Sequence, residues 1–201
     1  MPHRELFPTL LQEENLAETL VSDLHEACWM IEDGDQAGHA WCEAQGYPGY
    51  TSYASLEDLP QRHPAFADLV QELDTYAANF AALLDWELGE ARLDCDSLWV
   101  NILGEGGQHS GHIHPNSVIS GTAYIAMPEG AGALKLEDPR LPALMAAPPL
   151  TQTAKHPRFV YLAPKVGQVF MWESWLRHEV MPNRSESARI SISFNYSVTD
   201  A

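Results

Sequence analysis

Apolar residues recur at helical spacing in two segments of the N-terminal half of the chain. One segment covers residues 13–31, and the other runs from about Pro64 to Trp86. Both patterns are typical of amphipathic helices that bury one face. Pro64 suits a first helical turn, where its missing N–H is not needed, and Gly89 is a candidate C-terminal stop. Residues 34–60 are rich in Gly, Pro, Tyr and Ser, and are predicted to form an extended loop.

From Leu93 onward the pattern changes to short β-type runs separated by turn residues. The expected strands are Ser97–Leu103, Val118–Met127, Ala133–Glu137, Arg158–Leu162, Gln168–Trp172, His178–Met181 and Arg189–Val198. Short strands at this spacing favour an antiparallel sandwich or barrel. The pattern predicts one domain over residues 1–201, mainly β, in which a helical and loop region at 1–92 packs on a β core at 93–198.

The last expected strand has two chemically different faces, because successive side chains of a strand point to opposite sides. Ile190, Ile192 and Phe194 form an apolar face. The other face is polar and carries a cation, and consists of Arg189, Ser191, Ser193 and Asn195. In a barrel this pattern indicates a polar interior and an outer face that the two helical stripes could cover.

Two groups of residues suggest metal chemistry. His112 and His114 are two positions apart, so on an extended strand both can reach one ion, and imidazole suits iron, zinc, copper or nickel. Alone, such a pair more often belongs to a polar surface beside a turn than to a metal site. His109 is a candidate neighbour that could orient the pair. His178 is followed eleven residues later by Arg189. A metal with open positions can bind a 2-oxo acid, whose far carboxylate needs a cation such as an arginine fork.

The C-terminal half contains, in this order, the segments Ser97–Asn101, His112–Gly121, Leu136–Arg140, Trp175–Val180 and Arg189–Asn195. Together they resemble the bacterial 2-oxoglutarate-Fe(II) oxygenases, relatives of the prolyl hydroxylases that are built on the double-stranded β-helix, or jelly-roll, fold. The resemblance covers roughly residues 95–198, and more loosely Gly46–Tyr53. It implies a hydroxylase-type dioxygenase that uses Fe(II), 2-oxoglutarate and dioxygen on a substrate that the sequence does not identify.

The resemblance also implies roles for individual residues around the co-substrate. Arg189 would pair with the far carboxylate of 2-oxoglutarate. Tyr124 and Ser193 would donate hydrogen bonds to the same group, and Asn101 is a further candidate for this pocket. No catalytic residue is implied beyond the metal ligands.

The metal ligands implied by the resemblance are His112, His114 and His178, with one departure from the wider superfamily. That superfamily has Asp or Glu at the position of His114, and a neutral imidazole leaves the iron site one unit more positive. The site could therefore be all-histidine, or have two histidines and water with His114 turned aside. Glu137 or Asp138 could supply a carboxylate instead, although Asp138 also suits a turn that caps a strand.

Two alternative functions follow from the same residues. One is a cupin-like dioxygenase with three histidine ligands that oxidises its substrate without a 2-oxo acid. The other is a catalytically silent jelly-roll module that binds a metal or a small carboxylate. The sequence identifies neither the substrate nor the oligomeric state. A homodimer is compatible with it.

Charge and composition exclude other classes of function. A formal net charge of −17 argues against nucleic acid and anionic membranes as partners. The chain contains no run of eighteen apolar residues and begins without the features of a signal peptide, so a cytoplasmic location is expected. Cys28, Cys42 and Cys95 are far apart and odd in number, which favours structural thiols over disulfides or a zinc knuckle.

Overall fold

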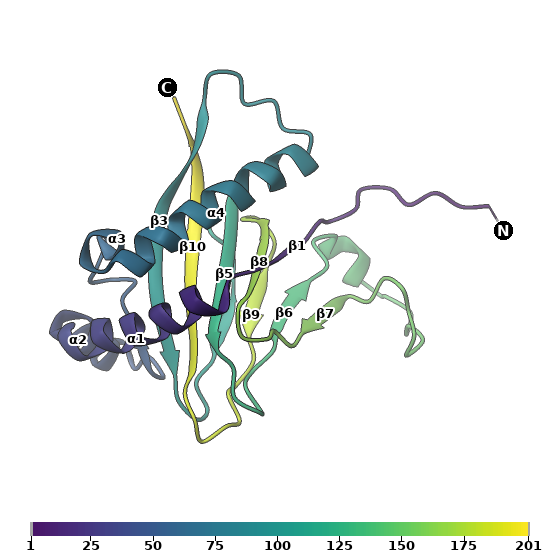
Figure 1. Ribbon diagram of the computed structural model, residues 1–201. Helices are drawn as coiled ribbons and strands as arrows, with labels where there is room; N and C mark the ends of the chain where they lie inside the picture. The colour runs from purple at the N-terminus through teal and green to yellow at the C-terminus, as the bar shows by residue number, and fades with distance from the viewer. Residues whose placement is uncertain (1, 201) are drawn as a thin grey trace.

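The computed structural model describes residues 2–200 as two antiparallel β-sheets with helices against the larger sheet (Figure 1). The strands are β1 (Gln12–Asn15), β2 (Tyr50–Thr51), β3 (Arg92–Leu103), β4 (His109–His112), β5 (Ile119–Ala126), β6 (Leu134–Glu137), β7 (Phe159–Leu162), β8 (Gln168–Glu173), β9 (His178–Val180) and β10 (Arg189–Thr199). The helices are α1 (Glu18–Gly34), α2 (Gln36–Gln45), α3 (Leu59–Arg62), α4 (Pro64–Leu83) and the 3₁₀ turn η1 (Leu141–Leu144).

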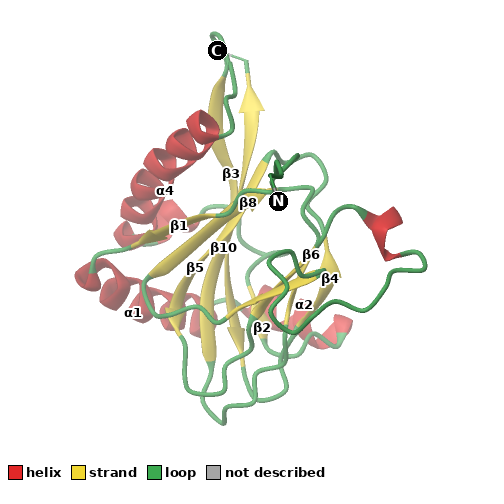
Figure 2. Ribbon diagram, turned by 90° about the vertical axis from the view of Figure 1, so that its right-hand side faces the viewer, coloured by secondary structure: helices red, strands yellow, loops and turns green. Residues whose placement is uncertain are grey.

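The two sheets face each other across a shared interior. The larger has the order β1-β8-β5-β10-β3-β2, and the smaller β4-β9-β6-β7. Tyr124 and Trp172 of the larger sheet pack in one buried cluster with Leu134 and Leu136 of the smaller sheet. Figure 2 shows α1 and α4 on one side of the strands, with β4 and β6 on the other. This arrangement is the double-stranded β-helix, which confirms the predicted fold class.

Strand β10 has the two faces that its sequence predicts. It lies between β3 and β5, with Ser193 opposite both Trp99 and Thr122. Its apolar side chains Ile190, Ile192 and Phe194 belong to the core cluster that also contains the buried residues of α1 and α4. Its polar side chains point into the space between the sheets. The helices therefore bury the apolar face and leave a polar interior, as expected.

The seven predicted strands are confirmed, with ends that differ by a few residues. The second predicted helix is confirmed as α4, with Pro64 in its first turn. Its predicted stop at Gly89 is wrong, because α4 ends at Leu83 and the chain turns at Asp85, which has a φ of +56°. Among residues 2–200 no helix is both long and apolar enough to cross a membrane.

Two predictions for the N-terminal half of the chain are wrong. The first helix begins at Glu18 rather than at residue 13, because Gln12–Asn15 pairs with β8 and extends the edge of the larger sheet. The predicted loop at 34–60 contains α2, β2 and α3. The amphipathic pattern of α2 is weak, and its ends are defined by the cap at Asp35 and by Gly46, which adopts the left-handed conformation.

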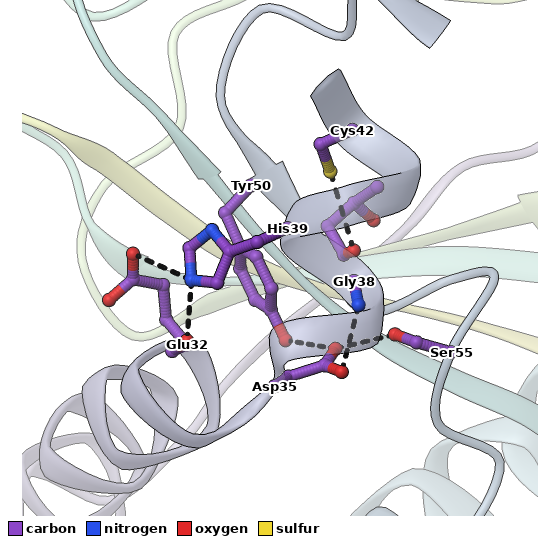
Figure 3. A network of polar contacts seen from close by, with 8 residues as sticks. Glu32, Asp35, Gly38, His39, Cys42, Tyr50 and Ser55 are labelled. Carbon is purple, nitrogen blue, oxygen red and sulfur yellow. Dashed lines mark hydrogen bonds and ion pairs between the residues drawn. The ribbon is translucent and has the colours of Figure 1, made fainter. Parts of the chain in front are cut away.

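A buried carboxylate joins α1, α2 and β2. Asp35 lies between the two helices and accepts hydrogen bonds from Gly38 N at 2.9 Å, from Tyr50 Oη at 2.8 Å and from Ser55 Oγ (Figure 3). Burial would raise the pKa of Asp35, but these hydrogen bonds outweigh it and hold the pKa below its usual value. The charged carboxylate therefore fixes β2 and the residues after it against the helices.

Replacement of Gly121 by alanine tests how closely β5 packs against β10. A Cβ atom at this position would lie 2.3 Å from Cζ of the buried Phe194 and 2.5 Å from the carbonyl oxygen of Phe170. Gly121→Ala should lower the free energy of unfolding by about 1–3 kcal/mol through overpacking, as measured by urea denaturation. The matched control is Gly104→Ala, where a Cβ meets nothing within 4 Å. Equal stability of the two variants would contradict this packing.

Asp35→Ala tests the buried carboxylate. The substitution removes a helix cap and leaves the hydroxyl groups of Tyr50 and Ser55 without their acceptor, so we expect the free energy of unfolding to fall by about 2–4 kcal/mol. Asp33→Ala, two residues away and exposed, is the control and should change it by less than about 0.5 kcal/mol. Similar melting temperatures for both variants would exclude the proposed role of Asp35.

Candidate metal centre

Three histidines meet in the smaller sheet. Nitrogen atoms of His112, His114 and His178 all lie within 4.8 Å of one another, and they form the one cluster of three or more potential metal-ligating side chains found in residues 2–200. His112 at the end of β4 lies opposite His178 at the start of β9. His114 follows β4, where its backbone N–H donates to Ser174 O at 3.1 Å. Two adjacent strands thus bring together residues 64 positions apart.

The backbone orients two of the rings. Nδ1 of His112 lies 2.7 Å from Ser110 O, and Nδ1 of His178 lies 2.9 Å from Leu176 O. Because a carbonyl oxygen only accepts, both Nδ1 atoms carry the proton and each Nε2 keeps a free lone pair. Nε2 of His114 and of His178 are 3.2 Å apart. Imidazole nitrogens that bind one ion at about 2.1 Å lie roughly 3 Å apart, so this separation suits a shared metal.

Burial keeps the rings of His114 and His178 neutral. Burial, followed by the proximity of His112, lowers the pKa of His178 to about 3 and that of His114 to about 4. Both imidazoles are therefore unprotonated near pH 7, which is the state that binds a metal ion.

The two carboxylates considered as alternative ligands are engaged elsewhere. Glu137 Oε2 lies 3.1 Å from Nε of Arg177, and Asp138 Oδ2 lies 2.7 Å from Nη2 of Arg140. Asp138 also accepts the backbone N–H of Arg140, as expected of a turn residue. Arg177 packs directly over Gly111, where a Cβ would lie 2.7 Å from its Nη2.

Arg189 is buried in the interior between the sheets, with 1% of its surface exposed. Its Nη1 donates to Ser191 Oγ at 3.0 Å, and its Cζ lies 5.4 Å from the ring centroid of Tyr124. Burial lowers the pKa of the guanidinium group, but arginine remains protonated in proteins. No described carboxylate forms an ion pair with Arg189, so an uncompensated positive charge lies inside the fold.

Three buried hydrogen-bond donors in this region have no partner in the described residues: Arg189 Nε, Tyr124 Oη and Trp172 Nε1. The Trp172 ring packs edge-on against His178, with 4.8 Å between ring centroids. An unsatisfied buried donor costs about 1–3 kcal/mol, and native proteins rarely leave one without reason. A ligand that only accepts hydrogen bonds, such as a carboxylate, would satisfy these donors.

The other two residues predicted for the pocket are already hydrogen-bonded. Asn101 Nδ2 donates to Ser193 Oγ at 3.2 Å, and Asn101 Oδ1 accepts from Thr51 Oγ1 at 2.9 Å and Tyr47 Oη at 3.3 Å. Tyr47 Oη also contacts Nε2 of His109. The ring of His109 lies 6.5 Å from that of His112, so the network reaches the edge of the triad.

A cavity of about 410 Å³ is lined by two members of the triad, His112 and His114, and by the neighbouring His109. Its lining includes residues that the sequence reasoning did not assign to the site, namely Trp41, Tyr47, Thr51, Tyr53, Trp99 and Gln108. Three of these residues, Trp41, Tyr47 and Tyr53, are aromatic and lie in the segment expected to be a loop, and this grouping is the sequence feature that could have indicated the site. The pairing of β2 with β3, which sets Thr51 opposite Asn101, brings this segment to the cavity, and the sequence pattern does not predict that pairing.

The lowered histidine pKa values predict how the metal-free protein responds to acid. An unfolded histidine has a pKa of about 6.5, so between about pH 4 and 6.5 the unfolded chain binds protons that folded His114 and His178 do not. Their stabilising contribution is complete above pH 6.5 and is lost as the pH falls. In urea denaturation from pH 7 to pH 5, His178→Gln should therefore show a shallower loss of stability than the wild type, by up to about 2 kcal/mol. Parallel profiles would contradict this account.

Comparisons with known proteins agree with the fold. The crystal structure of a Pseudomonas putida prolyl-4-hydroxylase matches over 94% of this chain and 92% of that chain, with 14% identity and a TM-score of 0.63. The alpha-ketoglutarate-dependent carbocyclase SnoK from nogalamycin biosynthesis matches over 94% and 79%, with 14% identity and a TM-score of 0.64. HygX from Streptomyces hygroscopicus, crystallised with nickel and 2-oxoglutarate, matches over 94% and 83%, with 13% identity and a TM-score of 0.63.

The sequence comparisons are more specific. No curated protein matches the chain. Residues 97–195 match the family model described as "Putative 2OG-Fe(II) oxygenase". This segment contains His112, His114 and His178, as well as Arg189. This segment of the chain is therefore similar to the 2OG-Fe(II) oxygenases.

Proposed function

We propose that His112, His114 and His178 hold Fe(II) in this 2-oxoglutarate-dependent oxygenase, and that Arg189 anchors the co-substrate. The observation that carries the proposal is the convergence of three imidazoles beside an interior that contains a buried guanidinium group with no described carboxylate paired to it. The donor set fits the metal, because imidazole suits Fe(II) and both oriented rings present Nε2. When bound, Fe(II) and 2-oxoglutarate would supply the oxidising chemistry, in which dioxygen and 2-oxoglutarate yield succinate and carbon dioxide while a substrate C–H bond is oxidised.

The residues of the interior would orient 2-oxoglutarate. Arg189 would bind its far carboxylate through Nε and the remaining guanidinium N–H groups, while Ser191 holds Nη1. Tyr124 would donate its free hydroxyl to the same carboxylate. Asn101 and Ser193 would line the pocket as a hydrogen-bonded pair. These contacts would neutralise the buried charge and satisfy donors that the protein leaves unpartnered.

His114 gives the site a different charge from one with a carboxylate ligand. Three neutral imidazoles leave the full charge of Fe(II) to be balanced by the co-substrate, whereas a carboxylate would remove one unit. The nearly parallel rings of His114 and His178 have centroids 5.1 Å apart, so His114 is not turned away from the triad. We propose an all-histidine site for this reason.

The all-histidine triad also supports the second candidate, a dioxygenase that needs no 2-oxo acid. The two functions differ in the role of Arg189. Loss of this guanidinium group should abolish 2-oxoglutarate dependence in the first case and leave metal binding and turnover largely intact in the second. The buried, unpaired state of Arg189 favours the first candidate, because a direct dioxygenase has no use for it.

We also propose that the enzyme works in the cytoplasm. Cys28 and Cys42 are buried free thiols, and Cys95 is a third free thiol at intermediate depth. Burial raises the pKa of the Cys28 thiol and keeps it protonated. Unpaired buried thiols of this kind suit a reducing compartment.

Anaerobic titration of the purified protein with Fe(II) and then 2-oxoglutarate tests the proposed function. We expect one equivalent of Fe(II) to bind and the weak visible charge-transfer band of a chelated 2-oxo acid to develop, followed by succinate formation on admission of air. His178→Gln should lose the band because it removes a metal ligand. Absence of the band from the wild-type protein, together with absence of succinate, would overturn the proposal.

Arg189→Met should weaken 2-oxoglutarate binding about 10- to 100-fold, since it removes charge-assisted hydrogen bonds worth about 1.5–3 kcal/mol while retaining a long side chain. The readout is the concentration of 2-oxoglutarate that gives half of the charge-transfer band. Fe(II) stoichiometry, measured in the same samples, reports whether the triad is intact. Arg92→Met is the control, because Arg92 lies at the start of β3, exposed and paired with Asp94. Unchanged 2-oxoglutarate affinity in Arg189→Met would exclude Arg189 as the anchor of the co-substrate.

A further inference from the structure

We propose that the cavity beside His112 and His114 takes an uncharged, ring-containing small molecule as the substrate, held by two aromatic pairs at its walls. The inference rests on the proposed function, since the substrate must reach the metal through this cavity. Its volume of about 410 Å³ lies within the range of roughly 300–1,000 Å³ that is usual for small-molecule sites.

The aromatic pairs lie at the two ends of the edge strand β2. Tyr53 follows β2 and packs edge-on against Trp99 of β3, with 5.2 Å between ring centroids. Tyr47 precedes β2 and packs against Trp41 of α2 at 6.2 Å. Thr51, within β2, lies between the pairs and is hydrogen-bonded to Asn101. The lining of the cavity therefore combines two aromatic pairs with polar groups.

One pair leads directly to the triad. The Trp99 ring lies 5.9 Å from that of His114, with 33° between the ring planes. Trp99 is 8% exposed and Tyr53 is 60% exposed. A ring bound against Tyr53 and Trp99 would lie beside the metal ligands, while substituents remain in the open part of the cavity. Aromatic contacts of this kind contribute about 0.5–1.5 kcal/mol beyond the area they bury.

The lining indicates the charge of the substrate. Of the described residues that line the cavity, none is Asp, Glu, Lys or Arg, and the polar groups are the amides and hydroxyls of Thr51, Asn101, Gln108, Ser110 and Asn195, besides the tyrosines and histidines. A charged molecule would lose hydration here without gaining an opposite charge. Aromatic faces also attract cations. However, the guanidinium group of Arg189 is buried in the interior and no described carboxylate pairs with it, so positive charge already lies within the fold. An uncharged molecule with neutral hydrogen-bonding groups fits best.

A set of probes with the same shape and different charge tests the inference: benzamide, benzoate and benzamidine, with cyclohexanecarboxamide as the non-aromatic control. Their dissociation constants are measured by ligand-observed NMR on the metal-free protein and on the protein loaded with Mn(II) and 2-oxoglutarate. We expect benzamide to bind at least about fivefold more tightly than either charged probe, and more tightly than the saturated ring. The measurement requires no turnover, so its outcome is separate from that of the charge-transfer titration.

Substitutions at the wall assign the probe to the cavity. Tyr53→Leu and Trp99→Leu should each weaken benzamide binding about 2- to 12-fold, the equivalent of 0.5–1.5 kcal/mol. Tyr53 is largely exposed, so its variant should fold even if Trp99→Leu does not. Trp29→Leu is the control, because Trp29 is on α1, outside the cavity, and 40% exposed. Benzamide affinity that neither wall variant changes would overturn the inference. So would a charged probe that binds as tightly as benzamide and is weakened by Tyr53→Leu.

Discussion

The strict alternation of polar and apolar side chains along β10 is the constraint on which both the core and the site depend. This strand is hydrogen-bonded on both sides, to β3 and β5, so its register is fixed twice. One face places Ile190, Ile192 and Phe194 beneath the helices. The other turns Arg189 into the interior. A slip of one residue would exchange the two faces, burying the guanidinium group among the helix side chains and exposing the apolar residues to the polar interior.

The interior differs from an ordinary core because some of its buried polar groups have no hydrogen-bond partner among the described residues. Arg189 and Tyr124 each keep a buried donor without a partner, and His178 is held neutral by burial. Removing an ion from water costs several kcal/mol unless an opposite charge replaces the solvent. Any ligand that binds only the folded state stabilises it through mass action. The same groups that lower the stability of the fold would thus give a metal ion and a dicarboxylate their binding energy.

The proposed metal ligands and part of the proposed substrate wall lie in different parts of the chain. The triad and Arg189 lie within residues 97–195, the segment that matches the family. Trp41, Tyr47 and Tyr53 lie outside it, on α2 and beside β2. Their positions depend on Asp35, which ties α2 and β2 to α1 (Figure 3). A shared fold can therefore keep one reaction while its N-terminal wall selects the molecule that is oxidised.

The sequence by itself determined the β core, because side-chain alternation is a local property: each of the seven expected strands is present, and β10 has its predicted faces. The spacing of His112 and His114 is equally local. Tertiary structure decided what depends on distant partners. Gln12–Asn15 became a strand because β8 lies beside it, and α2 formed where Asp35 could cap a polar segment. Strand pairing brings His178 to the other two histidines. It also brings Tyr47 and Tyr53 to the cavity. Packing between segments far apart in the chain likewise decides which carboxylates pair with arginines. It also decides which buried donors have no partner among the described residues.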